Sequence, residues 1–145
     1  MIDSWIYTSR HGTLPEHSPS SQAQSYALRS ARQAARAEGN LAIKLLRDRR
    51  NTFWTATLWT SEAAMKQFMI AGAHGRAMRN LLHWCNEAAL VHWTQEAAAL
   101  PSWPESHARL ETEGRPSKVN HPSSTHQAHK FPAPHVASFS ERASK

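Results

Sequence analysis

The chain has 145 residues, a length that suits one ordinary domain, and 40% of them are hydrophobic. Its formal charge of +6 is concentrated towards the C-terminus, because five of the 17 Lys and Arg residues but one of the 11 Asp and Glu residues follow Gly114. The weakly basic remainder lacks the concentrated Lys/Arg stripe of nucleic-acid-binding domains, so we expect no nucleic-acid partner. No apolar run approaches the ~20 residues that span a bilayer, and we expect no membrane span.

The first half of the chain predicts a strand, a helix and a β-hairpin. Alternating β-prone residues predict a strand over 4–10, followed by a polar loop. The stretch 21–37 is rich in Ala, Gln and Arg and predicts a helix that Gly39 ends. Two strands, 41–47 and 52–59, flank a polar turn. Apolar residues alternate onto both faces of this hairpin, so we expect helices to cover one face and a second sheet to cover the other.

A broken helix and a fourth strand follow the hairpin. An apolar stripe predicts a helix over 61–71 with Thr60 as its N-cap. Gly72 breaks this helix in a tight step, and a second helical piece is predicted over 76–84. Residues 88–93 then alternate as a strand.

The C-terminal third predicts one more helix and then a tail. Ser102 is a suitable N-cap, and Pro104 fits the first turn of a short helix that runs to about Glu113. The sequence after it is rich in Pro, Ser and His and has no apolar periodicity. We therefore predict one folded domain over 1–114 and a mostly disordered tail over 115–145, and we leave open whether its opening, 115–122, packs on the domain.

The predicted order β-α-β-β-α-β is the ferredoxin-like α+β pattern, with an antiparallel sheet that carries helices on one face. The other face would expose apolar side chains, including tryptophans. Pairing two such sheets would bury them, which predicts a homodimer.

One stretch resembles a known superfamily. WTSEAAMKQFMIAGAH, at 59–74, resembles the strand–helix signature of the antibiotic-biosynthesis-monooxygenase-like dimeric α+β barrels. In those proteins a strand ends in Trp, a Ser/Asp-Glu-Ala cap starts a helix, a Phe packs inward and a His follows. The matching residues here are Trp59, 61–63, Phe68 and His74. The resemblance extends over about 4–95, and it is closest to an uncharacterised branch related to spheroidene monooxygenase.

The resemblance implies the fold and several activities, since the superfamily includes oxygenases, haem enzymes, isomerases and members without known activity. In its haem-degrading members a His at the end of this helix is the proximal iron ligand. That role would fall on His74 and makes haem the candidate cofactor. Those enzymes also carry a Trp about ten residues earlier, where this chain has Ala64, so the resemblance to their mechanism is incomplete.

His74 is the predicted catalytic and cofactor-binding residue. After the glycine break it is expected to turn towards the space between helices and sheet, where three roles stay open. It is a haem ligand, a general acid or base near neutral pH, or a hydrogen-bonded packing residue. The nine-residue spacings from His74 to His83 and from His83 to His92 fit no short zinc motif, so we predict no metal site.

An apolar ligand pocket between sheet and helices is the second part of the predicted site. The residues predicted to line it are Trp54, Trp59, Phe68, Met78, Trp84 and His92. The alternative is that the tryptophans form core or dimer interface and that His92 is a hydrogen-bonded structural residue.

The predicted function is that of a small monooxygenase-like protein, haem-dependent or cofactor-free, that binds an apolar small molecule. The alternative is a non-catalytic dimeric ligand-binding or structural module of the same fold. The single cysteine, Cys85, excludes an intramolecular disulfide, and the start MIDSWIYTSRHG lacks signal-peptide features. We therefore expect a cytoplasmic protein.

Overall fold

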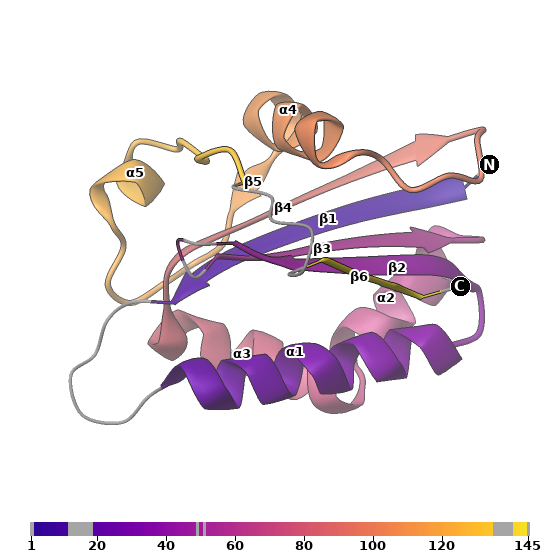
Figure 1. Cartoon of the computed structure of the whole chain (residues 1–145), viewed down its shortest axis with the longest axis horizontal. Coiled ribbons are helices and arrows are strands. Elements are labelled where there is room, and N and C mark those ends of the chain that lie inside the picture. The colour runs from indigo at the N-terminus through magenta and orange to yellow at the C-terminus, as the bar shows by residue number, and fades with distance from the viewer. Residues whose placement is uncertain (1, 12–18, 49, 51, 135–140, 145) are drawn as a thin grey trace.

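A computed structural model of the chain describes residues 2–11, 19–48, 50, 52–134 and 141–144. It contains a six-stranded antiparallel sheet of order β5-β4-β1-β3-β2-β6, with helices on both faces (Figure 1). The elements in chain order are β1 (Ile2–His11), α1 (Pro19–Arg36), β2 (Asn40–Arg47), β3 (Thr52–Trp59), α2 (Glu62–Ile70), α3 (Gly72–Trp84), β4 (Cys85–Gln95), α4 (Trp103–Glu113), β5 (Arg115–Pro116), α5 (Ser124–Gln127) and β6 (Glu141–Ser144).

The predicted β-α-β-β-α-β order and antiparallel sheet are confirmed, and β3 has the predicted bounds. Two local predictions were wrong. The N-cap of α2 is Ser61 rather than Thr60, because the Ser61 side chain accepts a hydrogen bond of 3.1 Å from the backbone N–H of Ala64. The second helical piece begins at Gly72, so His74 lies in the first turn of α3 and not in a step between helices. The predicted polar loop lies largely outside the described residues.

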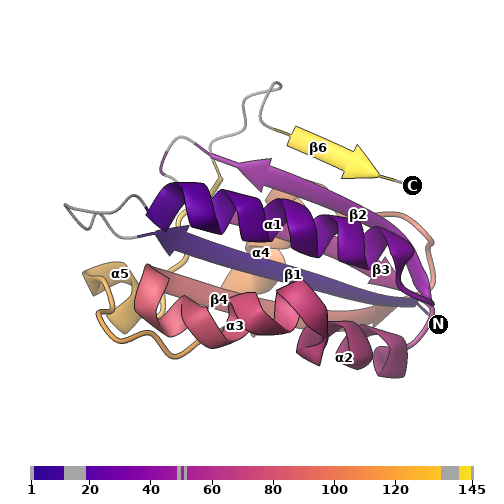
Figure 2. The same ribbon diagram turned by 90° about the horizontal axis from the view of Figure 1, so that it is seen from below.

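Helices α1, α2 and α3 cover one face of the sheet, which we call the helix face. Figure 2 shows α1 beside the α2–α3 pair on this face. The buried cluster between these helices and the sheet consists of Ala34, Ile43, Trp59, Met65, Phe68, Cys85, Ala88 and Val119.

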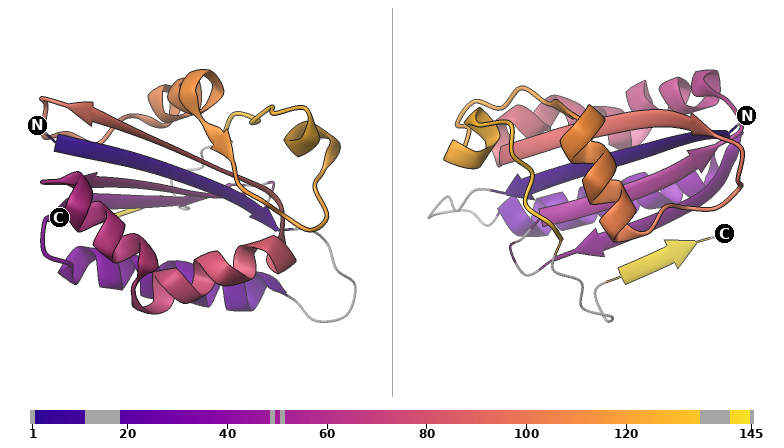
Figure 3. Two further views of the ribbon diagram at one scale, coloured as in Figure 1. Left: turned by 180° about the vertical axis from the view of Figure 1, so that it is seen from behind. Right: turned by 90° about the horizontal axis from the view of Figure 1, so that it is seen from above.

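The opposite face, which we call the α4 face, is covered by α4 and by the chain that follows it (Figure 3). Its buried cluster consists of Ile6, Leu46, Trp54, Ala56, Ala89, Val91, Trp93, Trp103, Leu110 and Phe131. As predicted, Ser102 caps α4 and Pro104 lies in its first turn. The expectation that a second sheet covers this face was wrong, because the chain's own C-terminal third packs there.

The segment 115–134 is ordered against the sheet, contrary to the mostly disordered tail that its composition predicts. The backbone N–H groups of Ser117 and Ser123 donate to the carbonyls of Ala88 and Asn86, at 2.8 and 2.9 Å. Val119, His126 and Phe131 anchor the segment and are buried. Farther on, β6 pairs with β2. The rest of the predicted tail lies outside the described residues.

Within the described ranges, no helix combines the length and the apolar character that crossing a bilayer requires.

Candidate functional site

A row of three stacked rings runs through the helix face. Trp59 ends β3, Phe68 lies on α2 and His74 lies in the first turn of α3. The ring centroids of Trp59 and Phe68 are 5.1 Å apart, and those of Phe68 and His74 are 4.4 Å apart. The predicted inward Phe and the predicted His therefore meet, with the strand-ending Trp beside them.

His74 is held in place by the break between α2 and α3. Its Nδ1 lies 3.0 Å from the carbonyl of Met69, and its backbone N–H donates to Oε1 of Gln33 at 3.0 Å. The Nε2 of the same Gln33 side chain donates to the carbonyl of Ala71 at 2.8 Å. Gln33 thus ties α1 to both sides of the break. Gly72 adopts φ +53 there, a conformation that favours glycine.

Burial lowers the pKa of His74, and the hydrogen bond to the Met69 carbonyl opposes this effect in part. The side chain is only 7% exposed, so the uncharged form prevails at neutral pH. Because Nδ1 donates its proton to a carbonyl, the lone pair of the neutral ring is on Nε2. This form suits iron ligation or general base catalysis only where a ligand or substrate can reach the ring, and the ring of His74 is almost fully buried.

The larger of the two described cavities is an open groove on the helix face, between α1 and α2, with a volume of about 570 Å³. Its lining consists of Gln33, Ala37, Glu38, Gly39, Thr60, Ser61, Ala63, Ala64, Gln67, Phe68 and Ala71. Of the three stacked rings, Phe68 reaches this groove. Trp59 and His74 are not part of its lining.

These residues do not fit a haem bound through His74. A proximal histidine has to present Nε2 to a cavity that holds the macrocycle, whereas His74 lines neither this groove nor the second cavity described below. The position that carries Trp in haem-degrading members of the superfamily is Ala64 here, a small residue crowded on one side by Gly39. The backbone of Gly39 approaches Ala64 so closely that a Cβ on the glycine would lie 2.7 Å from the Ala64 Cβ. We therefore assign no step to haem.

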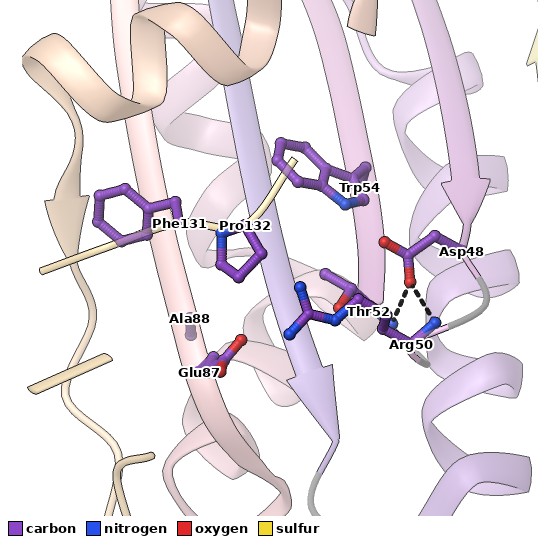
Figure 4. A pocket seen from close by; sticks show the side chains of 8 residues that line it. All are labelled: Asp48, Arg50, Thr52, Trp54, Glu87, Ala88, Phe131 and Pro132. Atoms are coloured by element: carbon purple, nitrogen blue, oxygen red, sulfur yellow. Dashed lines mark hydrogen bonds between the residues drawn. The ribbon is translucent and has the colours of Figure 1, made fainter. Parts of the chain in front are cut away.

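The second cavity lies on the α4 face and has a volume of about 10 Å³, room for about one water molecule (Figure 4). It is lined by Asp48, Arg50, Thr52, Trp54, Glu87, Ala88, Phe131 and Pro132. Oδ1 of Asp48 accepts hydrogen bonds from the backbone N–H groups of Arg50 and Thr52, at 2.8 and 3.1 Å, which fixes the β2–β3 turn at one wall. The C-terminal segment closes the other wall through Phe131 and Pro132.

The predicted pocket residues do not form one site. Phe68 and Trp59 belong to the helix-face cluster, and Met78 and Trp84 pack against it without lining the groove. Trp54 lies on the α4 face, beside Trp103 of α4 at a ring-centroid distance of 6.5 Å. Including it in a pocket with Trp59 was wrong, because residues five apart on a strand point to opposite faces.

His92 is on the helix face, paired with a residue that the sequence prediction missed. Its Nε2 lies 2.8 Å from Oδ1 of Asp3. The register of β1 against β4 places Asp3 opposite Thr94, diagonal to His92. No local pattern signals this pair, since its members are 89 residues apart and only the strand pairing brings them together.

Comparisons with known proteins agree with the fold. The profile of a family described as "Domain of unknown function (DUF3291)" matches residues 8–142. No curated protein gives a significant match.

Three solved structures illustrate the likeness. A variant of SnoaB, a cofactor-independent oxygenase from Streptomyces nogalater, is 16% identical over 66% of this chain and 94% of its own, with a TM-score of 0.52. A candidate antibiotic biosynthesis monooxygenase from Nitrosomonas europaea is 11% identical over 65% and 89%, with a TM-score of 0.56. PA3566 from Pseudomonas aeruginosa is 16% identical over 66% and 95%, with a TM-score of 0.56. At these identities the likeness establishes the fold, as the signature predicted, and does not test the relation to spheroidene monooxygenase.

Proposed function

The chain belongs to the DUF3291 family, and from this premise we propose that it is a small-molecule-binding protein with a monooxygenase-like fold. The ligand is largely apolar and lies in the groove between α1 and α2. The observation that carries the proposal is the groove itself, whose volume of about 570 Å³ lies within the range typical of ligand sites.

The lining of the groove favours binding over catalysis. Ala37, Ala63, Ala64 and Phe68 give it an apolar surface. Polar side chains supply hydrogen-bond donors and acceptors that orient a ligand, as in other small-molecule sites: Gln33, Thr60, Ser61 and Gln67. Glu38 is the titratable residue of this lining, and no histidine belongs to it.

Filling the groove with a bulky side chain tests the proposal. Ala63 is exposed and lines the groove, so Ala63→Trp occupies the ligand space without entering the core. Ala108 is equally exposed on α4, across the sheet, so Ala108→Trp is the matched control. With Nile red as an uncharged apolar probe, we expect saturable fluorescence enhancement in the wild type and the control. Ala63→Trp should weaken binding about tenfold, a loss of about 1.4 kcal/mol.

No saturable binding to the wild type, or equal affinity in all three proteins, would contradict the proposal.

Oxygenase activity, homodimerisation and a cytoplasmic location stay predictions. The fold shared with a cofactor-independent oxygenase supports the first of them. The argument from an open apolar face no longer supports a dimer, since α4 and Phe131 cover that face. Sedimentation velocity at micromolar concentration decides it, with twice the chain mass expected for a dimer.

A further inference from the structure

Asp3 is a buried carboxylate on the helix face. It is 5% exposed, and its described side-chain partner is His92. Burying a carboxylate is unfavourable unless it is paired or hydrogen-bonded, so the pairing with His92 is what makes this position tolerable. A single carboxylate and a single imidazole held together in this way also form the core of many acid–base sites.

His92 is bonded at one ring nitrogen and is partly accessible. Its Nε2–H donates to Oδ1 of Asp3 at 2.8 Å, while 28% of its side chain is exposed. With the proton on Nε2, the neutral ring carries its lone pair on Nδ1. Nδ1 has no hydrogen bond to the part of the chain that the structure describes. This is the arrangement in which a carboxylate orients an imidazole so that the other nitrogen acts as a base.

The Asp3–His92 pair has an aromatic residue on one side and charged residues near it. In the sheet register, Asp3 stands opposite Trp59, so the pair lies beside the first ring of the stacked row. Glu62, at the start of α2, forms an ion pair with Lys66. The pKa of Glu62 is lowered first by its hydrogen bond with Lys66 and by the charge of Lys66. The charge of His92 lowers it to a smaller extent. His92 therefore lies near the first turn of α2, with Asp3 as its ion-pair partner and Glu62 close enough to feel its charge.

We propose that Asp3 and His92 form a general-base pair that removes a proton from a small, weakly acidic organic molecule, such as a carbon acid or a phenol. Nδ1 of His92 takes the proton, and the bonding electron pair stays on the substrate as its carbanion or phenolate. Asp3 does not touch the substrate. It positions the imidazole and stabilises the imidazolium that forms. Neither residue lines the α1–α2 groove, so this inference is independent of ligand binding there.

The base-catalysed ring opening of 5-nitrobenzisoxazole measures such a base directly. The base takes the C3 proton, the C–H electron pair completes the nitrile, and the N–O bond breaks to give a coloured nitrophenolate. We expect the wild type to exceed an equal concentration of free imidazole by about 100-fold. His92→Gln should fall to the background rate. His83→Gln, at an exposed histidine of α3, should keep the wild-type rate.

The Asp3 variants separate positioning from a purely structural role. Asp3→Asn should lower the rate at least about tenfold, and the conservative Asp3→Glu should recover part of it. Carbethoxylation of the wild type by diethylpyrocarbonate needs no variant, and peptide mass spectrometry should find His92 modified faster than His83. A wild-type rate no higher than that of imidazole, an unchanged rate in His92→Gln, or slower labelling of His92 than of His83 would overturn the proposal.

Discussion

The two faces of the sheet are closed by different means. On the helix face, polar side chains tie the elements together. Gln33 bridges α1 to the break between α2 and α3, and Asp3 holds His92. On the α4 face, aromatic and aliphatic side chains such as Trp54, Trp103 and Leu110 are packed beneath a cover from the same chain. Polar side chains such as Asp48 and His107 also hold parts of the α4 face, but the open groove lies on the helix face. We therefore assign function to the helix face and mainly stability to the α4 face.

Removing the part of the α4-face cover that follows α4 should have the largest effect. A chain ending at Pro122 loses Phe131 and His126, both buried, and the hydrogen bond between the backbone N–H of Ala88 and the His126 ring. Burial of a large apolar side chain and each hydrogen bond contribute free energy, so we expect a loss of about 3–5 kcal/mol in urea unfolding. The sequence alone predicts that 123–145 are dispensable, with a change within about 1 kcal/mol.

A chain that ends at Pro134 is the control, because it keeps the described anchors of the segment. If the two truncated chains unfold at the same urea concentration, residues 123–134 contribute nothing to stability, and the proposed difference between the two faces is wrong.

Single core truncations test whether both faces are equally well packed. Leu110 is fully buried on the α4 face, and Phe68 is nearly so on the helix face. Leu110→Ala and Phe68→Ala should each cost about 3 kcal/mol, as large-to-small substitutions in packed cores do. Leu41→Ala, at a side chain that is 38% exposed, should cost less than about 1 kcal/mol. A cost at Leu110 no larger than that at Leu41 would show a loosely covered α4 face.

Much of this architecture could be predicted from local patterns. The alternation of apolar residues predicts the strands, and Ser102 and Pro104 predict the start of α4. The sequence leaves the packing of 115–122 on the domain open. The docking of 123–134 could not be predicted, because His126 and Phe131 are irregularly spaced and belong to no periodic stripe.

The candidate site was predicted less well. The Trp59–His74 signature predicts that Phe68 packs inward and that His74 turns towards it, and the two rings are in contact, with Trp59 on the other side of Phe68. Trp54 was misplaced although strand alternation already puts it on the other face. Asp3 was missed because its pairing depends on the register of β1 with β4, which no local pattern reveals.

The burial of His74 should make the stability of the helix face depend on pH. Burial lowers its pKa in the folded state, so between the folded value and the ordinary value near 6.5 the unfolded chain binds more protons. Its contribution to stability is therefore complete above about pH 6.5 and is lost as the pH falls through the folded pKa.

We expect His74→Gln to remove this part of the pH dependence and to cost about 1–3 kcal/mol at neutral pH, because the buried ring and its bond to Met69 are lost. The exposed His83→Gln should keep the wild-type pH profile. Urea unfolding between pH 5 and pH 8, at intervals of about half a unit, gives both comparisons. Identical profiles for the wild type and His74→Gln would show that His74 titrates as it does in the unfolded chain.

The smallest expected effect concerns the bridge from α1 to the helix break. Gln33→Ala removes two hydrogen bonds, one from the backbone of His74 and one to Ala71, at a half-buried position where water can replace part of what is lost. We therefore expect a cost of about 1 kcal/mol rather than the full value of two buried hydrogen bonds. Gln67→Ala, on the exposed surface of α2 in the same groove, should change stability by less than about 0.5 kcal/mol. If the two alanine variants are equally stable, Gln33 does not hold the break, and the helix face depends on ring packing as the α4 face does. A larger loss for Gln33→Ala, with faster amide hydrogen exchange at His74, would confirm that polar ties distinguish the helix face.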